Sequence, residues 1–158
     1  MTPGKLARLR FLARVVDKEC RHLETTDRRL FAVAMTAVRA ASLADDADLA
    51  ERVEAFVGRF GRLQDTLADK LLPAILSALG EQTGAQIDNL DRAERLGWVE
   101  SADQWLAIRQ LRNQMVHEYM EDMDMLASAL QSGHGFVPTL LRTANAMVGE
   151  LLARGWGE

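Results

Sequence analysis

Four polar residues bring a cation, an amide, an imidazole and a phenol together within a short stretch: Arg112, Asn113, His117 and Tyr119. An imidazole gains and loses a proton near neutral pH, so His117 could act as a general acid or base. A guanidinium such as that of Arg112 stabilises negative charge that builds up on phosphoryl oxygens. Asn113 could orient His117 or hold the phosphate. These residue types indicate phosphodiester cleavage that needs no metal ion.

An amphipathic helix would position these side chains. With 3.6 residues per turn, Arg112 and Tyr119 lie two turns apart on one face, and Asn113 and His117 lie one turn apart on an adjacent face. The apolar residues around them recur at helical spacing and form one stripe: Trp105, Ile108, Leu111, Met115, Val116, Tyr119, Met123, Leu126 and Leu130. The sequence predicts a helix that carries this stripe as far as Leu130.

Arg112 falls within that apolar stripe, and its charge needs a partner there. A guanidinium stays protonated in proteins, and burying it unpaired is strongly unfavourable. Asp65 and Asp69 are among the acids available to pair with it, and the sequence does not choose between them. An ion pair that only fixes the register of two helices is the structural alternative to a phosphate site, and the two roles are compatible.

The order Arg-Asn-x-x-x-His-x-Tyr resembles the HEPN superfamily. It matches the Arg-x4-His-x-Tyr form of the HepT-like toxins at each specified position, and it is similar to proteins described as nucleotidyltransferase substrate-binding subunits. The segment Arg59 to Asp65 is also similar to a long-helix segment of that group. The resemblance extends from about Leu49 to Leu130 and implies a single HEPN-like helical domain over residues 1–158.

The resemblance implies a toxin of a toxin-antitoxin pair, a metal-independent endoribonuclease with Arg112, His117 and Asn113 as its catalytic residues. Acid-base cleavage of RNA needs one group to deprotonate the 2′-hydroxyl and another to protonate the leaving 5′-oxygen, yet the motif supplies one His. The family resolves this with two motifs across a two-fold axis, so a homodimer is expected. The family also implies a minimal nucleotidyltransferase antitoxin that transfers AMP from ATP to Tyr119.

Two other functions remain open from the sequence. The chain could be a non-catalytic binding subunit that presents substrate, or Tyr119, to a nucleotidyltransferase. It could also be a helical adaptor without a site, in which case Arg112 would pair internally and His117 would face bulk water. For Tyr119 the structural reading is a phenol at the end of the apolar stripe, with its hydroxyl at water.

Composition narrows the possible partners and compartments. A net charge of −4 over 158 residues disfavours binding of a long RNA by the whole surface but allows a local arginine-lined site. Cys20 is the single cysteine, which excludes an intramolecular disulfide and thiolate-rich metal sites. His22 and His134 lack metal-ligand companions and are expected to be structural or exposed. We therefore expect a cytoplasmic protein with no metal, no cofactor and no membrane span.

Capping signals divide the chain into helices. Thr2 and Pro3 predict the start of a first helix, and the segment Thr25 to Asp27 could cap a second one with its face from Leu30 to Ala41, unless the two run together. The acidic junction Ala44 to Asp48 is expected to be a helix start rather than a cation loop. A long helix from Leu49 to Leu79 should bend or divide near Lys70 because of Pro73.

The second half of the chain carries two capping-box patterns. Thr83 to Gln86 predicts a short helix from Gln86 to Leu96 that Gly97 closes, and Ser101 to Gln104 predicts the start of the motif helix. The glycines of Ser132 to Gly135 are expected to break the chain before a final helix from Pro138 to Arg154. The result is an all-α, largely up-and-down bundle of five to six helices.

Overall fold

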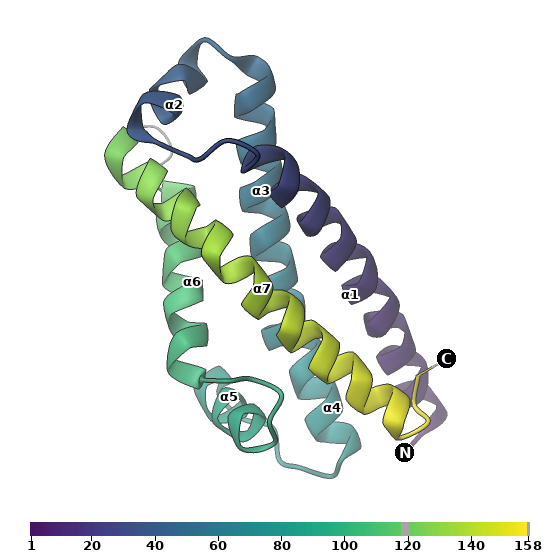
Figure 1. Cartoon of the computed structure of the whole chain (residues 1–158). Coiled ribbons are helices and arrows are strands. Elements are labelled where there is room, and N and C mark those ends of the chain that lie inside the picture. The colour runs from purple at the N-terminus through teal and green to yellow at the C-terminus, as the bar shows by residue number, and fades with distance from the viewer. Residues whose placement is uncertain (118–120, 158) are drawn as a thin grey trace.

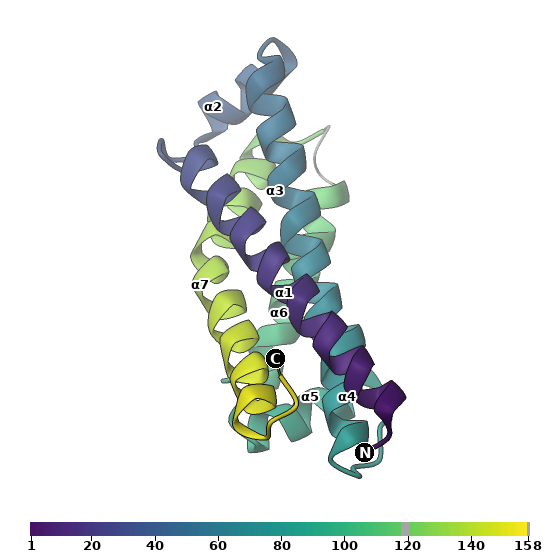
Figure 2. The same ribbon diagram turned by 90° about the vertical axis from the view of Figure 1, so that its right-hand side faces the viewer.

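The computed structural model describes residues 1–117 and 121–157, and the regular structure in these ranges is helical. The predicted all-α bundle is therefore confirmed. Its longest elements are α1 (Pro3–Leu30), α7 (Met123–Ala153), and α3 (Ala47–Asp65), which continues through a π-helical turn (Thr66–Leu71) into α4 (Leu72–Ala78). Figure 1 shows α6 (Ala102–His117) beside α7, and Figure 2 shows α1 running over α3 and α4.

The first helix begins where the sequence predicted and ends later. The Thr2 hydroxyl accepts a hydrogen bond from the Lys5 amide at 3.2 Å, with Pro3 as the first helical residue. α1 then runs through the segment from Thr25 to Asp27, which the sequence had left open as the start of a second helix. Of the segment expected to form that helix, only the five residues of α2 (Ala37–Ala41) form a separate α-helix, followed by a 3-10 turn (Ser42–Ala44).

Side chains satisfy the backbone of the turn between α1 and α2, where part of that second helix was expected. Arg39 Nη1 donates to the carbonyl oxygens of Leu30 at 2.7 Å and Val33 at 2.6 Å. The Met35 amide donates to Gln131 Oε1 of α7 at 3.0 Å. Because these backbone groups have hydrogen-bond partners without forming a helix, the non-helical turn costs little free energy.

The long predicted helix divides near Lys70, as expected from Pro73. Asp46 accepts a hydrogen bond from the Leu49 amide at 3.0 Å, so the acidic junction is a helix cap, as predicted. The π-helical turn occupies residues 66–71, and Pro73 lies in the first turn of α4. Proline has no amide hydrogen and its ring crowds the preceding turn, and the wider π-helical turn accommodates both effects.

The short helix α5 (Gln86–Arg95) is confirmed, but Thr83 does not cap it. Ala85 occupies the N-cap position, and the Asn89 side chain holds the loop instead: it accepts from the Gly84 amide at 3.0 Å and donates to the Gly84 carbonyl at 3.2 Å. Gly97 follows with φ of +81°, a conformation that glycine adopts without strain. At the start of α6, the Ser101 hydroxyl accepts from the Gln104 amide at 3.1 Å, as predicted.

The predicted break at Ser132 to Gly135 is wrong, because α7 is helical from Met123 through Pro138 to Ala153. The single helix expected to carry the apolar stripe to Leu130 is also wrong, since Asp122 caps α7 by accepting from the Met125 amide at 3.1 Å. The buried residues of α7 line one side of the helix along most of its length. That burial outweighs the cost of the internal glycines and proline.

The core is built mainly from aliphatic side chains, with fully buried Phe56, Phe60 and Trp105 among its largest members. The Phe56 ring is in edge-on contact with Phe31 and tilted against Phe60, at ring-centroid distances of 5.1 and 5.8 Å. Of the helices described here, none has the length and apolar character needed to cross a membrane.

Gly133→Ala is expected to leave the protein at least ~1 kcal/mol less stable than Gly135→Ala, although both changes occur in the same turn of α7. A Cβ at Gly133 would lie 3.2 Å from Met115 Sδ and from the Phe56 ring, and both of those residues are fully buried. A Cβ at Gly135 would meet nothing within 4 Å and would favour the helix. Urea denaturation of the two variants checks this, and equal midpoints would contradict it.

Candidate functional site

α6 carries three of the predicted site residues, Arg112, Asn113 and His117. Arg112 is partly exposed, Asn113 is exposed, and His117 is the last residue of α6. Tyr119, the predicted acceptor of a nucleotidyl group, lies outside the described residues. The Ser101 cap at one end and the buried side chains of Trp105, Ile108, Leu111 and Met115 fix this helix against the core.

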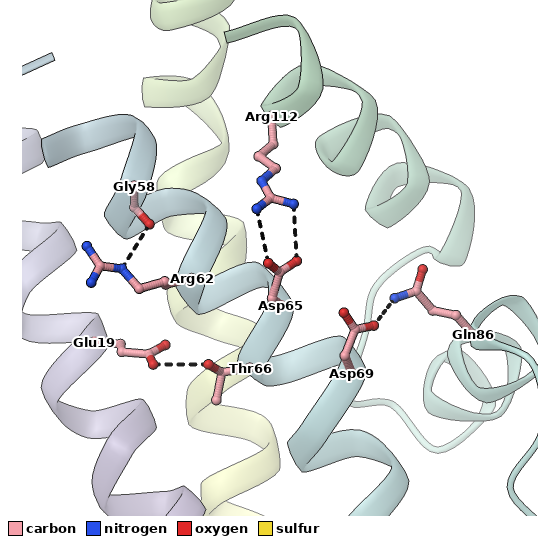
Figure 3. A network of polar contacts seen from close by, with 8 residues as sticks. All are labelled: Glu19, Gly58, Arg62, Asp65, Thr66, Asp69, Gln86 and Arg112. Carbon is pink, nitrogen blue, oxygen red and sulfur yellow. Dashed lines mark hydrogen bonds and ion pairs between the residues drawn. The ribbon is translucent and has the colours of Figure 1, made fainter. Parts of the chain in front are cut away.

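Arg112 forms a two-pronged ion pair with Asp65 of α3 (Figure 3). Nη2 lies 3.1 Å from Asp65 Oδ2, and Nη1 lies 3.4 Å from Asp65 Oδ1. Asp65 is one of the two acids that the sequence offered as partners. The planar guanidinium presents two N–H groups to the two carboxylate oxygens, so this geometry fixes the direction of the Arg112 side chain.

Arg112 has the charged partner that the sequence required, but in the single chain it is only partly buried. Its side chain is 33% exposed and that of Asp65 is 39% exposed. The buried face of α6 is formed by its other apolar residues, whereas Val116 of the stripe is 51% exposed. Water therefore screens the ion pair, which is expected to contribute at most ~1 kcal/mol to stability.

Gly61 of α3 makes room for the Arg112 side chain. A Cβ at this position would lie 2.7 Å from Arg112 Nε, too close for nonbonded atoms, and in tight contact with its Cζ at 3.3 Å. Gly61 itself is buried near the end of α3, before the chain continues into the π-helical turn, and glycine is otherwise unfavourable within a helix. The sequence shows a glycine within the long helix but gives no sign that Arg112 lies over it.

Gly61→Ala is expected to displace Arg112 and break its ion pair with Asp65. The helical preference of alanine offsets part of the loss, so the sharper test is a double-mutant cycle with Arg112→Ala. Once the Arg112 side chain is removed, Gly61→Ala should become neutral or stabilising in urea denaturation. The same loss of stability in both backgrounds would show that the crowding lies elsewhere.

A second set of polar contacts joins α6 to α5 and to the π-helical turn, one turn before Arg112. The Arg109 guanidinium donates to the Gln86 side-chain oxygen, and Gln86 Nε2 donates to Asp69 Oδ1 (Figure 3 shows the second contact). Asp69, the other acid offered for Arg112, is thus engaged by Gln86. Arg112 thus contacts Asp65 directly, and Arg109 is linked to Asp69 through Gln86. These contacts fix the position of α6 relative to α3 and the π-helical turn.

His134 has a partner that the sequence did not indicate. Its Nδ1 lies 2.7 Å from Asp27 Oδ1 of α1, and its ring stacks on Phe31 at a centroid distance of 4.4 Å and an interplanar angle of 22°. Because Asp27 and His134 are 107 positions apart, no local pattern could have paired them. The contact joins α1 to α7 and supports the structural role expected for this histidine.

Within residues 1–117 and 121–157, no cluster of three or more His, Cys, Asp or Glu side chains is placed to hold a metal ion. Comparison with family models, with curated proteins and with solved structures gives no match to the chain. The resemblance to the HEPN superfamily therefore rests on the residues from Arg112 to Tyr119 and on the segment from Arg59 to Asp65.

Proposed function

We propose that this protein is a HepT-like member of the HEPN superfamily that cleaves RNA as a homodimer without a metal ion. The proposal is carried by the motif spacing on α6: the partly exposed Arg112 and the exposed Asn113 lie on its last turns, and His117 is its last residue. Arg112 would stabilise the pentavalent phosphorus, and Asn113 would orient His117 or hold the phosphate.

In this reaction the 2′-oxygen attacks phosphorus and the bond to the 5′-oxygen breaks. His117 of one subunit takes the proton from the 2′-hydroxyl, and His117 of the partner subunit gives a proton to the leaving 5′-oxygen. The products are a 2′,3′-cyclic phosphate and a 5′-hydroxyl. Exposed apolar side chains near the motif, Val116 on α6 and Met125 on α7, suit a contact with a second copy.

The ion pair with Asp65 sets a condition on catalysis. Arg112 must share its N–H groups between Asp65 and the phosphate, or exchange one for the other. Because the pair is partly exposed, this exchange costs little. The proposed antitoxin, a minimal nucleotidyltransferase, would transfer AMP from ATP to the Tyr119 oxygen with release of pyrophosphate, and the added phosphate would then compete for Arg112.

A non-catalytic subunit that presents Tyr119 or another substrate to a nucleotidyltransferase is the second candidate. The observation that favours it is that Asp65 already neutralises the charge of Arg112. In that case the ion pair only fixes α6 against α3. The chain would then form a stable complex with a nucleotidyltransferase and would leave RNA intact.

Incubation of the purified protein with RNA in the presence of a chelator separates the two candidates. The proposed ribonuclease should release fragments that end in a 2′,3′-cyclic phosphate, which acid treatment opens to 2′- and 3′-monophosphates. Intact RNA after incubation with a folded, dimeric protein would rule out the ribonuclease and leave the binding subunit.

A further inference from the structure

A cavity between α1 and α3 contains a second group of charged residues that the proposed ribonuclease does not use. It has a volume of about 190 Å³ and is lined by Glu19, His22, Arg59 and Arg62. Figure 3 shows Arg62 directed toward α1, whereas Asp65 points toward α6 and Arg112. The α1–α3 cavity therefore lies on a different side of α3 from the motif.

The two arginines of the α1–α3 cavity contact only neutral acceptors among the described residues. Arg59 Nη1 donates to the Thr26 hydroxyl and, at 3.2 Å, to the His22 carbonyl. Arg62 Nε donates to the Gly58 carbonyl at 3.3 Å. The Nη groups of Arg62 and the Nε and Nη2 groups of Arg59 have no hydrogen-bond acceptor within the described part of the chain. Two like charges three residues apart on a helix also repel each other, so an anion between them would be favoured.

Glu19 on α1 compensates this positive charge only in part. Its Oε1 accepts a hydrogen bond from the Thr66 hydroxyl at 3.0 Å, and neither of its oxygens lies within ion-pair distance of Arg59 or Arg62 in the described structure. Burial raises the pKa of Glu19 above its ordinary value, while the Thr66 hydrogen bond and the nearby cations act against that rise. One carboxyl group thus faces two guanidinium groups, so the lining keeps a positive charge although the whole chain carries −4.

We propose that the α1–α3 cavity binds a tetrahedral oxyanion, either inorganic phosphate or the terminal phosphate of a nucleotide. The free N–H groups of Arg62 and Arg59 would donate to the phosphate oxygens, and the fixed position of Arg59 against Thr26 would direct its remaining N–H groups. Charge-assisted hydrogen bonds of this kind are among the strongest that side chains make. The site is independent of the ribonuclease proposed above.

Calorimetric titration with sodium phosphate at constant ionic strength tests the proposal. The full-length protein should bind phosphate, and Arg62→Gln should weaken binding at least ~10-fold because it removes a charged donor. Lys5→Gln removes the same charge at an exposed position near the start of α1 and should leave binding unchanged. No saturable binding by the wild type up to ~10 mM phosphate, or equal binding by Arg62→Gln, would overturn the proposal.

A second variant keeps the test decisive if Arg62→Gln does not fold. Glu19→Gln preserves the shape of the side chain and an acceptor for Thr66 but removes the negative charge, so phosphate binding should become tighter. Weaker or unchanged binding would count against the site. Titration with AMP shows which of the two ligands the site accepts. If both AMP and inorganic phosphate bind, the site accepts the terminal phosphate of a nucleotide; if only inorganic phosphate binds, the ligand is the free ion.

Discussion

Arg112→Ala and His117→Ala should each lower the rate of RNA cleavage by at least ~100-fold. Removing Arg112 takes away the charge that stabilises the pentavalent phosphorus. Removing His117 takes away both proton-transfer groups of a homodimer, one from each subunit. The rate is measured on a defined RNA in chelator, under single-turnover conditions, so that product release does not hide the chemical step.

Arg109→Ala is the matched control for the loss of an arginine from α6. It removes the same charge one turn earlier and breaks the contact with Gln86, but it leaves the motif intact. Its cleavage rate should stay within a factor of a few of the wild type. If Arg109→Ala is as slow as Arg112→Ala, or if wild type and the motif variants cleave equally, the catalytic role of the motif is refuted.

Phe56→Ala should destabilise the protein by ~3–5 kcal/mol, the largest effect on stability that we expect from a single substitution. Phe56 is fully buried, its ring contacts Phe31 and Phe60, and Gly133 of α7 approaches it closely. Truncation would thus leave a cavity where α3, α7 and the end of α1 meet. Urea denaturation monitored by circular dichroism gives the change in the free energy of unfolding.

Phe11→Ala provides the comparison for this core substitution. Phe11 is 48% exposed on α1, and its ring lies 5.8 Å from the Arg8 guanidinium carbon. Its loss should cost less than ~1 kcal/mol, because little apolar surface is withdrawn from water there. Similar losses for Phe56→Ala and Phe11→Ala would contradict the packing described around Phe56.

Helix starts were predictable from the sequence where a single residue forms the cap. Thr2, Asp46 and Ser101 each accept a hydrogen bond from an amide three residues later, an interaction that depends only on local sequence. Asp122 does the same at the start of α7, and its position before Met123 was a signal that sequence reasoning missed. The capping prediction for Thr83 was wrong because the Asn89 side chain, and not that of Thr83, makes hydrogen bonds to the backbone of this loop.

The continuity of α7 could not be predicted from local signals. Gly133, Gly135 and Pro138 normally indicate a break, but tertiary packing decides here. Gly133 has to be small because Phe56 and Met115, from two other helices, lie against it. That requirement depends on contacts far apart in the sequence, as does the turn that Gln131 holds through Met35.

The candidate site was predictable in its residues and partly in its pairing. Helical spacing placed Arg112, Asn113 and His117 on one helix, and the need to compensate the Arg112 charge indicated Asp65 or Asp69. The exposure of Arg112 was not predictable, because it depends on how α6 lies against α3. The role of Gly61 beneath the Arg112 side chain depends on the same packing.

The central claim, that two copies of α6 meet at the motif, is tested most directly by a distance between spin labels in the dimer. A label at Gln114→Cys lies on the exposed side of α6 beside the motif, and one at Ile87→Cys lies on α5 at the opposite end of α6 (Figure 1). Burial and nearby carboxylates raise the pKa of Cys20 to about 12, so the native thiol should label slowly. We predict that the two Gln114 labels are closer together than the two Ile87 labels. Closer Ile87 labels, or no coupling between Gln114 labels because the protein is a monomer, would contradict the claim.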